Sequence, residues 1–180
     1  SNEAALGPSP KALAAYEAAR ADLAAYPVGP ATDLREAIGD IHTLDPDRVI
    51  CGCGSDEILN LLCRAYAGPG DEVIVPAPYW VSYTDMALAN DGSPVVLACP
   101  ESQGFKLTPA QLEAAISPRT RWLMINSPCN PTGAIYSGDE YRALAEVTFD
   151  SEGRIATANL AGLWRLAQMY AGSAMVPEHY

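Results

Sequence analysis

The stretch TRWLMINSPCNPTG, residues 120–133, joins an apolar run to a loop that holds two prolines and a glycine. The run from Thr120 to Asn126 predicts a short buried strand. Pro128 and Pro131 restrict the residues before them to extended conformations, and both X-Pro bonds can adopt either isomer. The loop is therefore either an ordinary turn or a rigid segment that presents Asn130 to a ligand.

Outward from this stretch, short apolar runs alternate with helical patterns. Strands are expected at residues 47–52, 72–76, 93–99 and 120–126, and helices at residues 11–25, 31–42, 54–71, 79–91, 108–116 and 138–147. The expected helix caps are Ser9, Thr32 or Asp33, Ser55 or Asp56, and Thr108 with Pro109 after it. This order predicts an α/β fold with three αβα layers around a mostly parallel sheet. No strand is expected after Val147, and the tail predicts one amphipathic helix with Leu160, Leu163, Trp164, Ala167 and Tyr170 on one face.

The composition excludes several classes of function. The net charge of −11 and the pI of 4.4 argue against a nucleic-acid or anionic-membrane surface. No apolar run reaches the ~18 residues of a membrane span, and no signal segment opens the chain. The five cysteines include a C-x-C pair, Cys51 and Cys53, without a zinc-ligand spacing, so we expect no metal site. Reduced thiols predict a cytoplasmic protein.

Three loops follow predicted strands and carry unusual residues. CGCGSDE, residues 51–57, combines glycines with a helix start and predicts a phosphate cradle, although an ordinary strand-to-helix turn has the same composition. VPAPYW, residues 75–80, places Tyr79 and Trp80 where they would either stack on a planar ring or pack in the core. NSPCNPTG is the third. Because ligands bind beyond the carboxyl ends of parallel strands, the three loops together predict one phosphorylated, planar ligand.

The ordered motifs of residues 2–147 resemble those of class I/II aminotransferases of pyridoxal-phosphate fold type I. They include YPVGPATDLREAI at 26–38, GSDEILNLLCRAYAGPGDEVI at 54–74, PYWVSY at 78–83 and SPCNPTG at 127–133. Residues 2–75 are most similar to histidinol-phosphate aminotransferase, and residues 78–147 to aspartate/aromatic aminotransferases, as in a truncated or chimeric chain. The resemblance implies the N-terminal half of the fold type I large domain, a homo-oligomer, and pyridoxal 5'-phosphate as cofactor.

The resemblance also implies roles for individual residues. The cofactor phosphate would lie at Gly54, Ser55 and Asp56, with Tyr26 of a second copy reaching it. Trp80, or Tyr79 if the register shifts by one, would stack on the ring. Asn130 would donate to the phenolic oxygen of the cofactor, and Gly29 would lie near the substrate.

Three residues that the family requires have no match in the chain. The two lysines, Lys11 and Lys106, do not occupy the Schiff-base position, and Asp150 comes too early to pair with the pyridinium nitrogen. The carboxylate-binding arginine is also missing. We therefore expect an N-terminal arm and helix (1–30), a partial cofactor-binding domain (31–147) and a tail that does not match the family (148–180). The expected function is amino-group transfer between an amino acid and a 2-oxo acid by family, without activity in this chain alone. The alternative is a non-catalytic module that folds or oligomerises and binds cofactor phosphate weakly.

Overall fold

The computed structural model describes residues 7–148 and 166–169. The chain divides into two compact units, Ser1–Gly52 and Cys53–Tyr180, and each is described by itself. The predicted domains, 1–30, 31–147 and 148–180, stay a prediction. No helix of the described residues is long and apolar enough to cross a membrane.

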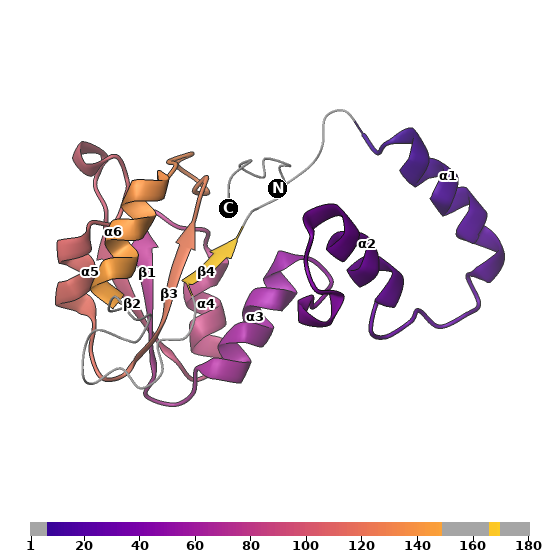
Figure 1. The fold of residues 1–180 in the computed structure, drawn as a ribbon. Coiled ribbons are helices and arrows are strands. Elements are labelled where there is room, and N and C mark those ends of the chain that lie inside the picture. Colours follow the sequence, from indigo (N-terminus) through magenta and orange to yellow (C-terminus); the bar gives the residue numbers. More distant parts are fainter. Residues whose placement is uncertain (1–6, 149–165, 170–180) are drawn as a thin grey trace. The chain divides into compact units, whose positions relative to one another are not determined.

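The first unit consists of helices and turns (Figure 1). They are α1 (Pro10–Ala19), η1 (Arg20–Asp22), α2 (Thr32–His42) and η2 (Pro46–Arg48). Ser9 caps α1 as expected, because its side chain accepts a hydrogen bond from the Ala12 N–H. The predicted cap of α2 is wrong: its N-cap is Ala31, at a φ of 50°, with no side-chain hydrogen bond.

The predicted strand at residues 47–52 is also wrong. Residues 46–48 form η2, which α2 holds through two hydrogen bonds from the Arg35 guanidinium to the Pro46 carbonyl, at 2.8 and 2.6 Å. Residues 49–52 have no strand pairing, and Ile50 is 76% exposed. A strand requires a neighbour for its backbone N–H and C=O groups, and the described part of the chain provides none here.

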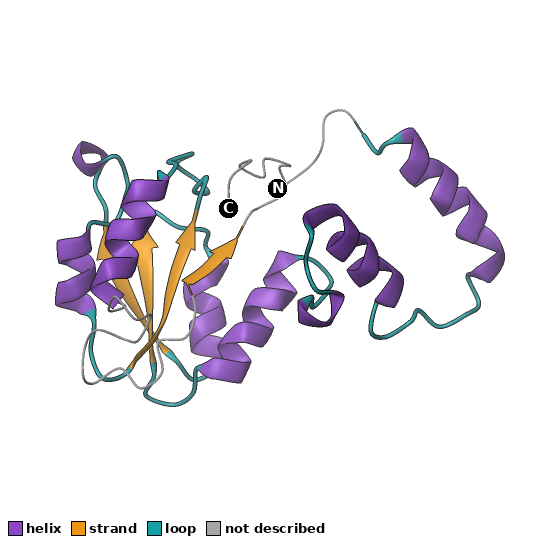
Figure 2. Ribbon diagram, viewed as in Figure 1, coloured by secondary structure: helices purple, strands orange, loops and turns teal. Residues whose placement is uncertain are grey.

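The second unit is a parallel sheet between two layers of helices (Figures 1 and 2). Its strands are β1 (Glu72–Ala77), β2 (Ser93–Ala98), β3 (Thr120–Asn126) and β4 (Leu166–Met169), in the order β2-β1-β3-β4. All neighbouring strands run parallel, with Ile74 opposite Val95 and Leu123, and Leu123 opposite Leu166. Helices α3 (Ser55–Tyr66) and α4 (Ser82–Ala89) cover one face, and α5 (Pro109–Ala115) and α6 (Gly138–Thr148) cover the other. The predicted α/β fold is confirmed.

Alternate side chains of the strands fill two cores, one on each face of the sheet. Trp122 and Met124 of β3 pack with Leu59, Cys63 and other residues of α3 and α4. Leu123 and Ile125 of β3 pack on the opposite face, with residues of α5 and α6. This period-two alternation explains why β3 is apolar at successive positions, because both of its faces are buried.

Of the helix caps predicted in the second unit, that of α5 is confirmed and that of α3 is wrong. Thr108 and Gln111 form the reciprocal capping box of α5, with Pro109 in the first turn, as expected. The predicted cap of α3 at Ser55 or Asp56 is wrong: Gly54 is the N-cap, and both residues already have helical positions.

The expectation of no strand after Val147 is wrong as well, because β4 lies beside β3. Ala167, expected on an amphipathic helix, is in this strand, whereas Leu160, Leu163, Trp164 and Tyr170 lie outside the described residues. An open edge of β3 would leave N–H and C=O groups unpaired, and pairing with β4 satisfies them.

Candidate functional site

The start of α3 offers hydrogen-bond donors that its own residues do not use. Gly54 has a φ of 90°, a conformation that glycine adopts without strain, and it turns the chain into the helix. The Glu57 carboxylate turns back to accept the Cys53 N–H at 2.5 Å. Within the described ranges, the N–H groups of Ser55 and Asp56 and the Ser55 hydroxyl have no hydrogen-bond partner. Together with the positive end of the helix dipole, these donors can bind an anion.

Tyr79 and Trp80 follow the end of β1 and a cis Ala77–Pro78 bond. Both side chains are half-buried and pack against the core on the α3 and α4 face. Core packing, one of the two predicted alternatives, therefore holds for both residues, and the part of each that stays exposed can still contact a ligand. Their stacking role stays a prediction.

The loop of residues 126–133 is held by hydrogen bonds as well as by its prolines. Both of its X-Pro bonds are cis. The Asn126 side chain accepts the Asn130 N–H at 2.8 Å, and the Cys129 carbonyl accepts the Gly133 N–H at 2.7 Å. The Ser127 hydroxyl accepts the Tyr136 N–H at 3.0 Å. The backbone of Asn130 is thus fixed, while the residue is exposed.

A small pocket lies at the carboxyl ends of β1 and β3. Aromatic rings dominate its wall, and the lining includes Pro78, Tyr79, Tyr83, Phe105, Asn126, Cys129 and Tyr136. Burial raises the pKa of Tyr136 to about 12, and its hydroxyl accepts the Leu107 N–H at 2.6 Å. Burial also raises the pKa of Tyr83, and charge on Cys129 and on Asp56 adds to the effect. Asp56 belongs to the first turn of α3, so the helix start lies within electrostatic reach of the pocket wall.

Three of the predicted features belong to the second unit: the start of α3, Tyr79 and the loop that carries Asn130. Trp80 and Asn130 are not among the residues that line the pocket. Tyr26 and Gly29 belong to the first unit, where Tyr26 is 98% exposed. Their predicted roles at the cofactor and the substrate stay predictions.

The sequence prediction assigned no role at the site to several pocket residues, among them Tyr83, Cys129 and Tyr136. Tyr83 follows Trp80 by three residues and lies in the first turn of α4, so the spacing of about one helical turn could have placed both near one strand end. Cys129 stands next to Asn130 within the loop already singled out. Tyr136 carried no signal, because its approach to Leu107 depends on contacts between distant segments.

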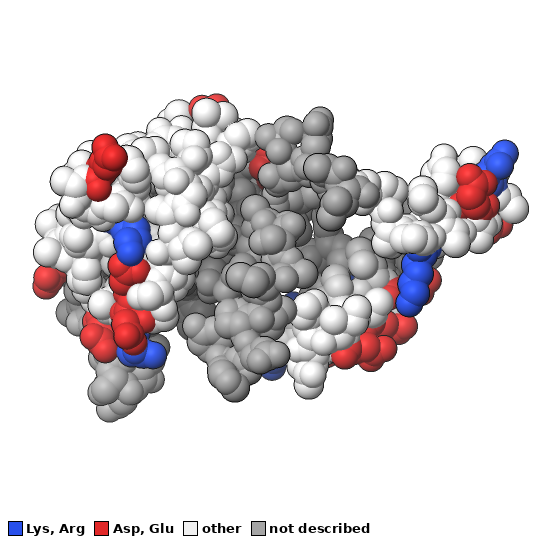
Figure 3. All heavy atoms as spheres, turned by 90° about the horizontal axis from the view of Figure 1, so that it is seen from above, with Lys and Arg blue, Asp and Glu red and all other residues white. Residues whose placement is uncertain are grey.

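Neither of the two lysines lines the pocket. Lys106 forms an ion pair with Glu140, which lowers the pKa of that carboxyl, and Lys11 lies in α1. No cluster of His, Cys, Asp and Glu suited to a metal ion occurs among the described residues. On the face seen in Figure 3, basic side chains are few and scattered among acidic ones.

Comparison with known proteins defines the class. The family model for "Aminotransferase class I and II" matches residues 1–155, so this chain belongs to that family. Members of this family depend on pyridoxal phosphate. The resemblance read from the motifs is thereby confirmed.

Individual relatives point to two kinds of aminotransferase. The chain is 57% identical over 102 residues to the aspartate/prephenate aminotransferase of Cereibacter sphaeroides, which covers 57% of this chain and 26% of that protein. It is 46% identical over 146 residues to the histidinol-phosphate aminotransferase of Dinoroseobacter shibae. This match covers 81% of this chain and 40% of that protein. The crystal structure of the aspartate aminotransferase from Rhizobium meliloti matches with a TM-score of 0.72 and 37% identity. The match covers 82% of this chain and 39% of that one. The chain thus spans two fifths or less of the length of these relatives.

Proposed function

We propose that this chain carries the phosphate-binding and ring-binding part of an aminotransferase site that moves an amino group between an amino acid and a 2-oxo acid. One observation carries the proposal: the unpaired donors at the start of α3 belong to the same unit as Tyr79 and the Asn130 loop, and charge on Asp56 and on Cys129 acts on Tyr83 of the pocket wall. A phosphate and a planar ring on one ligand require this pairing of an anion site with an aromatic pocket.

The residues present fit pyridoxal 5'-phosphate. The N–H groups at the start of α3 and the Ser55 hydroxyl would hold the phosphate, since Gly54 leaves space on its Cβ side. Trp80 or Tyr79 would cover the ring, and the exposed Asn130 amide would donate to its phenolic oxygen. When bound, the cofactor supplies the electron sink for amino-group transfer.

Further contacts would come from outside the second unit. In an oligomer, Tyr26 of a second copy would reach the phosphate, and Gly29 would bring backbone near the substrate. The exposure of Tyr26 supports this role, because a side chain in water is free to contact a neighbour. Five free thiols support a reducing compartment, the cytoplasm.

We further infer that this chain alone binds the cofactor without covalent attachment and without turnover. Neither lysine lines the pocket, and Lys106 is held by Glu140. Borohydride treatment in the presence of pyridoxal phosphate, followed by peptide mass spectrometry, tests this. Specific labelling of either lysine, or transamination by the chain, would contradict it.

The binding test compares two ligands that differ only in the phosphate. Pyridoxal phosphate should bind the wild-type chain more tightly than pyridoxal does. Ser55→Ala should lower the affinity for pyridoxal phosphate by about tenfold, because one hydrogen bond to a charged group is lost. The affinity for pyridoxal should stay unchanged. Ser102→Ala, at an exposed serine of η3 (Glu101–Gln103), is the matched control and should change neither affinity. Equal affinities of the wild-type chain for the two ligands would refute the phosphate cradle.

The alternative function, a non-catalytic module that oligomerises, is favoured by the surface of the first unit. Helix α1 has no buried residue, and several apolar side chains of this unit are more than half exposed: Leu13, Tyr16, Leu23, Val28 and Ile41. Such a surface is typical of a contact between copies. Light scattering tests it, since Leu23→Ser with Ile41→Ser should convert an oligomer into a monomer.

A further inference from the structure

We propose that the Tyr83 hydroxyl is a ligand-binding donor of this site, which contacts the ring of the bound cofactor rather than its phosphate. The inference rests on the proposed function and adds a residue to it. Tyr83 has no role in the phosphate cradle, in the stacking pair or in the Asn130 loop.

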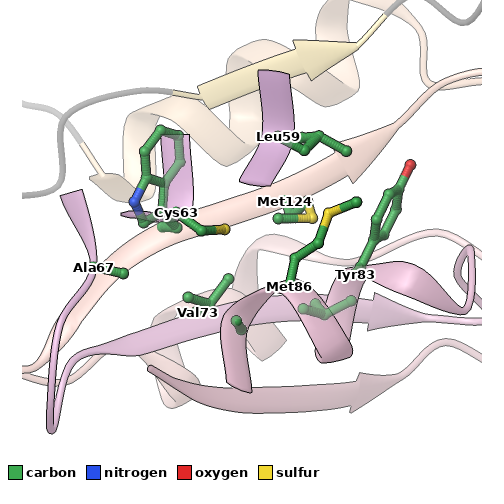
Figure 4. Packing of buried hydrophobic residues seen from close by; sticks show 10 residues of the cluster. Leu59, Cys63, Ala67, Val73, Tyr83, Met86 and Met124 are labelled. Atoms are coloured by element: carbon green, nitrogen blue, oxygen red, sulfur yellow. The ribbon is translucent and has the colours of Figure 1, made fainter. Parts of the chain in front are cut away.

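The Tyr83 ring is fixed by its packing. Tyr83 lies in the first turn of α4, where its N–H donates to the Trp80 carbonyl at 3.0 Å. Only 5% of the residue is exposed, and it packs with Leu59, Met86 and Met124. Figure 4 shows it at the end of this cluster toward which the strands run, with its hydroxyl directed away from Val73. The hydroxyl therefore has a defined position at the carboxyl edge of the sheet.

The hydroxyl makes no hydrogen bond within residues 7–148 and 166–169, and it is not fully enclosed by protein atoms. Tyr83 nevertheless lines the pocket, beside Tyr79, Asn126 and Cys129. Tyr136, the other buried tyrosine of the wall, differs because its hydroxyl accepts the Leu107 N–H. A hydroxyl that is fixed at a pocket wall, accessible and without a protein partner can donate to an acceptor on a ligand.

The electrostatic surroundings keep this hydroxyl a donor. Burial raises the pKa of Tyr83, and charge on Cys129 and Asp56 raises it further, so the phenol stays protonated at neutral pH. Asp56 belongs to the start of α3 and Cys129 to the Asn130 loop. Tyr83 lines the pocket whereas Gly54, Ser55 and Asp56 do not, so we assign its hydroxyl to the ring and not to the phosphate.

Removal of the hydroxyl tests the inference. Tyr83→Phe should lower the affinities for pyridoxal phosphate and for pyridoxal by the same factor, about fivefold for the loss of one neutral hydrogen bond. Calorimetric titration measures both affinities. Inorganic phosphate should bind Tyr83→Phe and the wild-type chain equally. The thermal midpoint without ligand should not fall, because no protein hydrogen bond is lost. Tyr16→Phe, at an exposed tyrosine of α1, is the control and should bind all three probes as the wild-type chain does.

A second variant tests whether Tyr83 acts through its hydrogen-bond donor or only through the packing of its ring. Tyr83→His keeps a ring with an N–H donor and should retain more pyridoxal affinity than Tyr83→Phe. Equal affinity of Tyr83→Phe and the wild-type chain for pyridoxal would overturn the inference while the proposed function stands. A parallel loss of inorganic phosphate binding would also overturn it. If the wild-type chain binds none of the three probes, both the inference and the proposed function are wrong.

Discussion

The replacement of Gly54 by alanine isolates the backbone strain at the start of α3. Gly54 has a φ of 90° and a ψ of 173°, and a Cβ built on it meets no atom within 4 Å. The cost of Gly54→Ala is therefore conformational and not steric. An L-residue in this region costs about 1–3 kcal/mol, and alanine recovers about 0.4–1 kcal/mol by restricting the unfolded chain. We expect a net loss of about 1–2 kcal/mol in the free energy of unfolding.

Gly68→Ala is the matched control in the same unit. Gly68 does not have a positive φ, and its nearest neighbour to an added Cβ is Asp71 Oδ2 at 3.9 Å. Its N–H, which donates to Asp71, is retained in alanine. This variant should be neutral or more stable than the wild-type chain by up to about 1 kcal/mol.

Urea unfolding followed by tryptophan fluorescence measures the difference, because all three tryptophans, Trp80, Trp122 and Trp164, belong to the second unit. Pyridoxal phosphate affinity should also fall in Gly54→Ala, since relief of the strain turns the N–H groups of the α3 start away from the anion. Equal stability of Gly54→Ala and Gly68→Ala would refute the reasoning that Gly54 is required for its conformation.

Two further predictions concern buried polar groups of the second unit. Glu72 is 6% exposed and accepts hydrogen bonds from Ser117, Thr120 and Arg119, which lower its pKa. Because its pKa is lower in the folded state, its contribution is present above the unfolded pKa and is lost as the pH falls through the folded pKa. Glu72→Gln should therefore cost about 2 kcal/mol near neutral pH and flatten the acid limb of a stability–pH curve, and an unchanged acid limb would contradict this. Tyr136→Phe leaves the buried Leu107 N–H unpaired and should cost about 1–3 kcal/mol in urea unfolding, whereas a neutral effect would exclude this hydrogen bond.

The candidate site was predictable where its chemistry is local. The glycine before α3, the aromatic pair after β1 and the proline-locked loop after β3 each stand at a strand end that the alternating pattern reveals. The Tyr83 hydroxyl was not predictable, because its lack of a partner depends on what α3, β3 and the Asn130 loop place around it. A tyrosine in an apolar helix pattern is indistinguishable from a core residue in the sequence.

The sequence by itself determined the order of helices and strands from α3 to α6, the Thr108 capping box, the buried character of β3 and membership of the aminotransferase family. These features depend on neighbours within a few residues or on motif order. Only the tertiary structure decided that residues 49–52 form no strand and that residues 166–169 do, because strand formation requires a partner that is distant in the chain. The tertiary structure also decided which side chains meet at the pocket, since packing and not spacing brings α3, α4 and the Asn130 loop to one edge of the sheet.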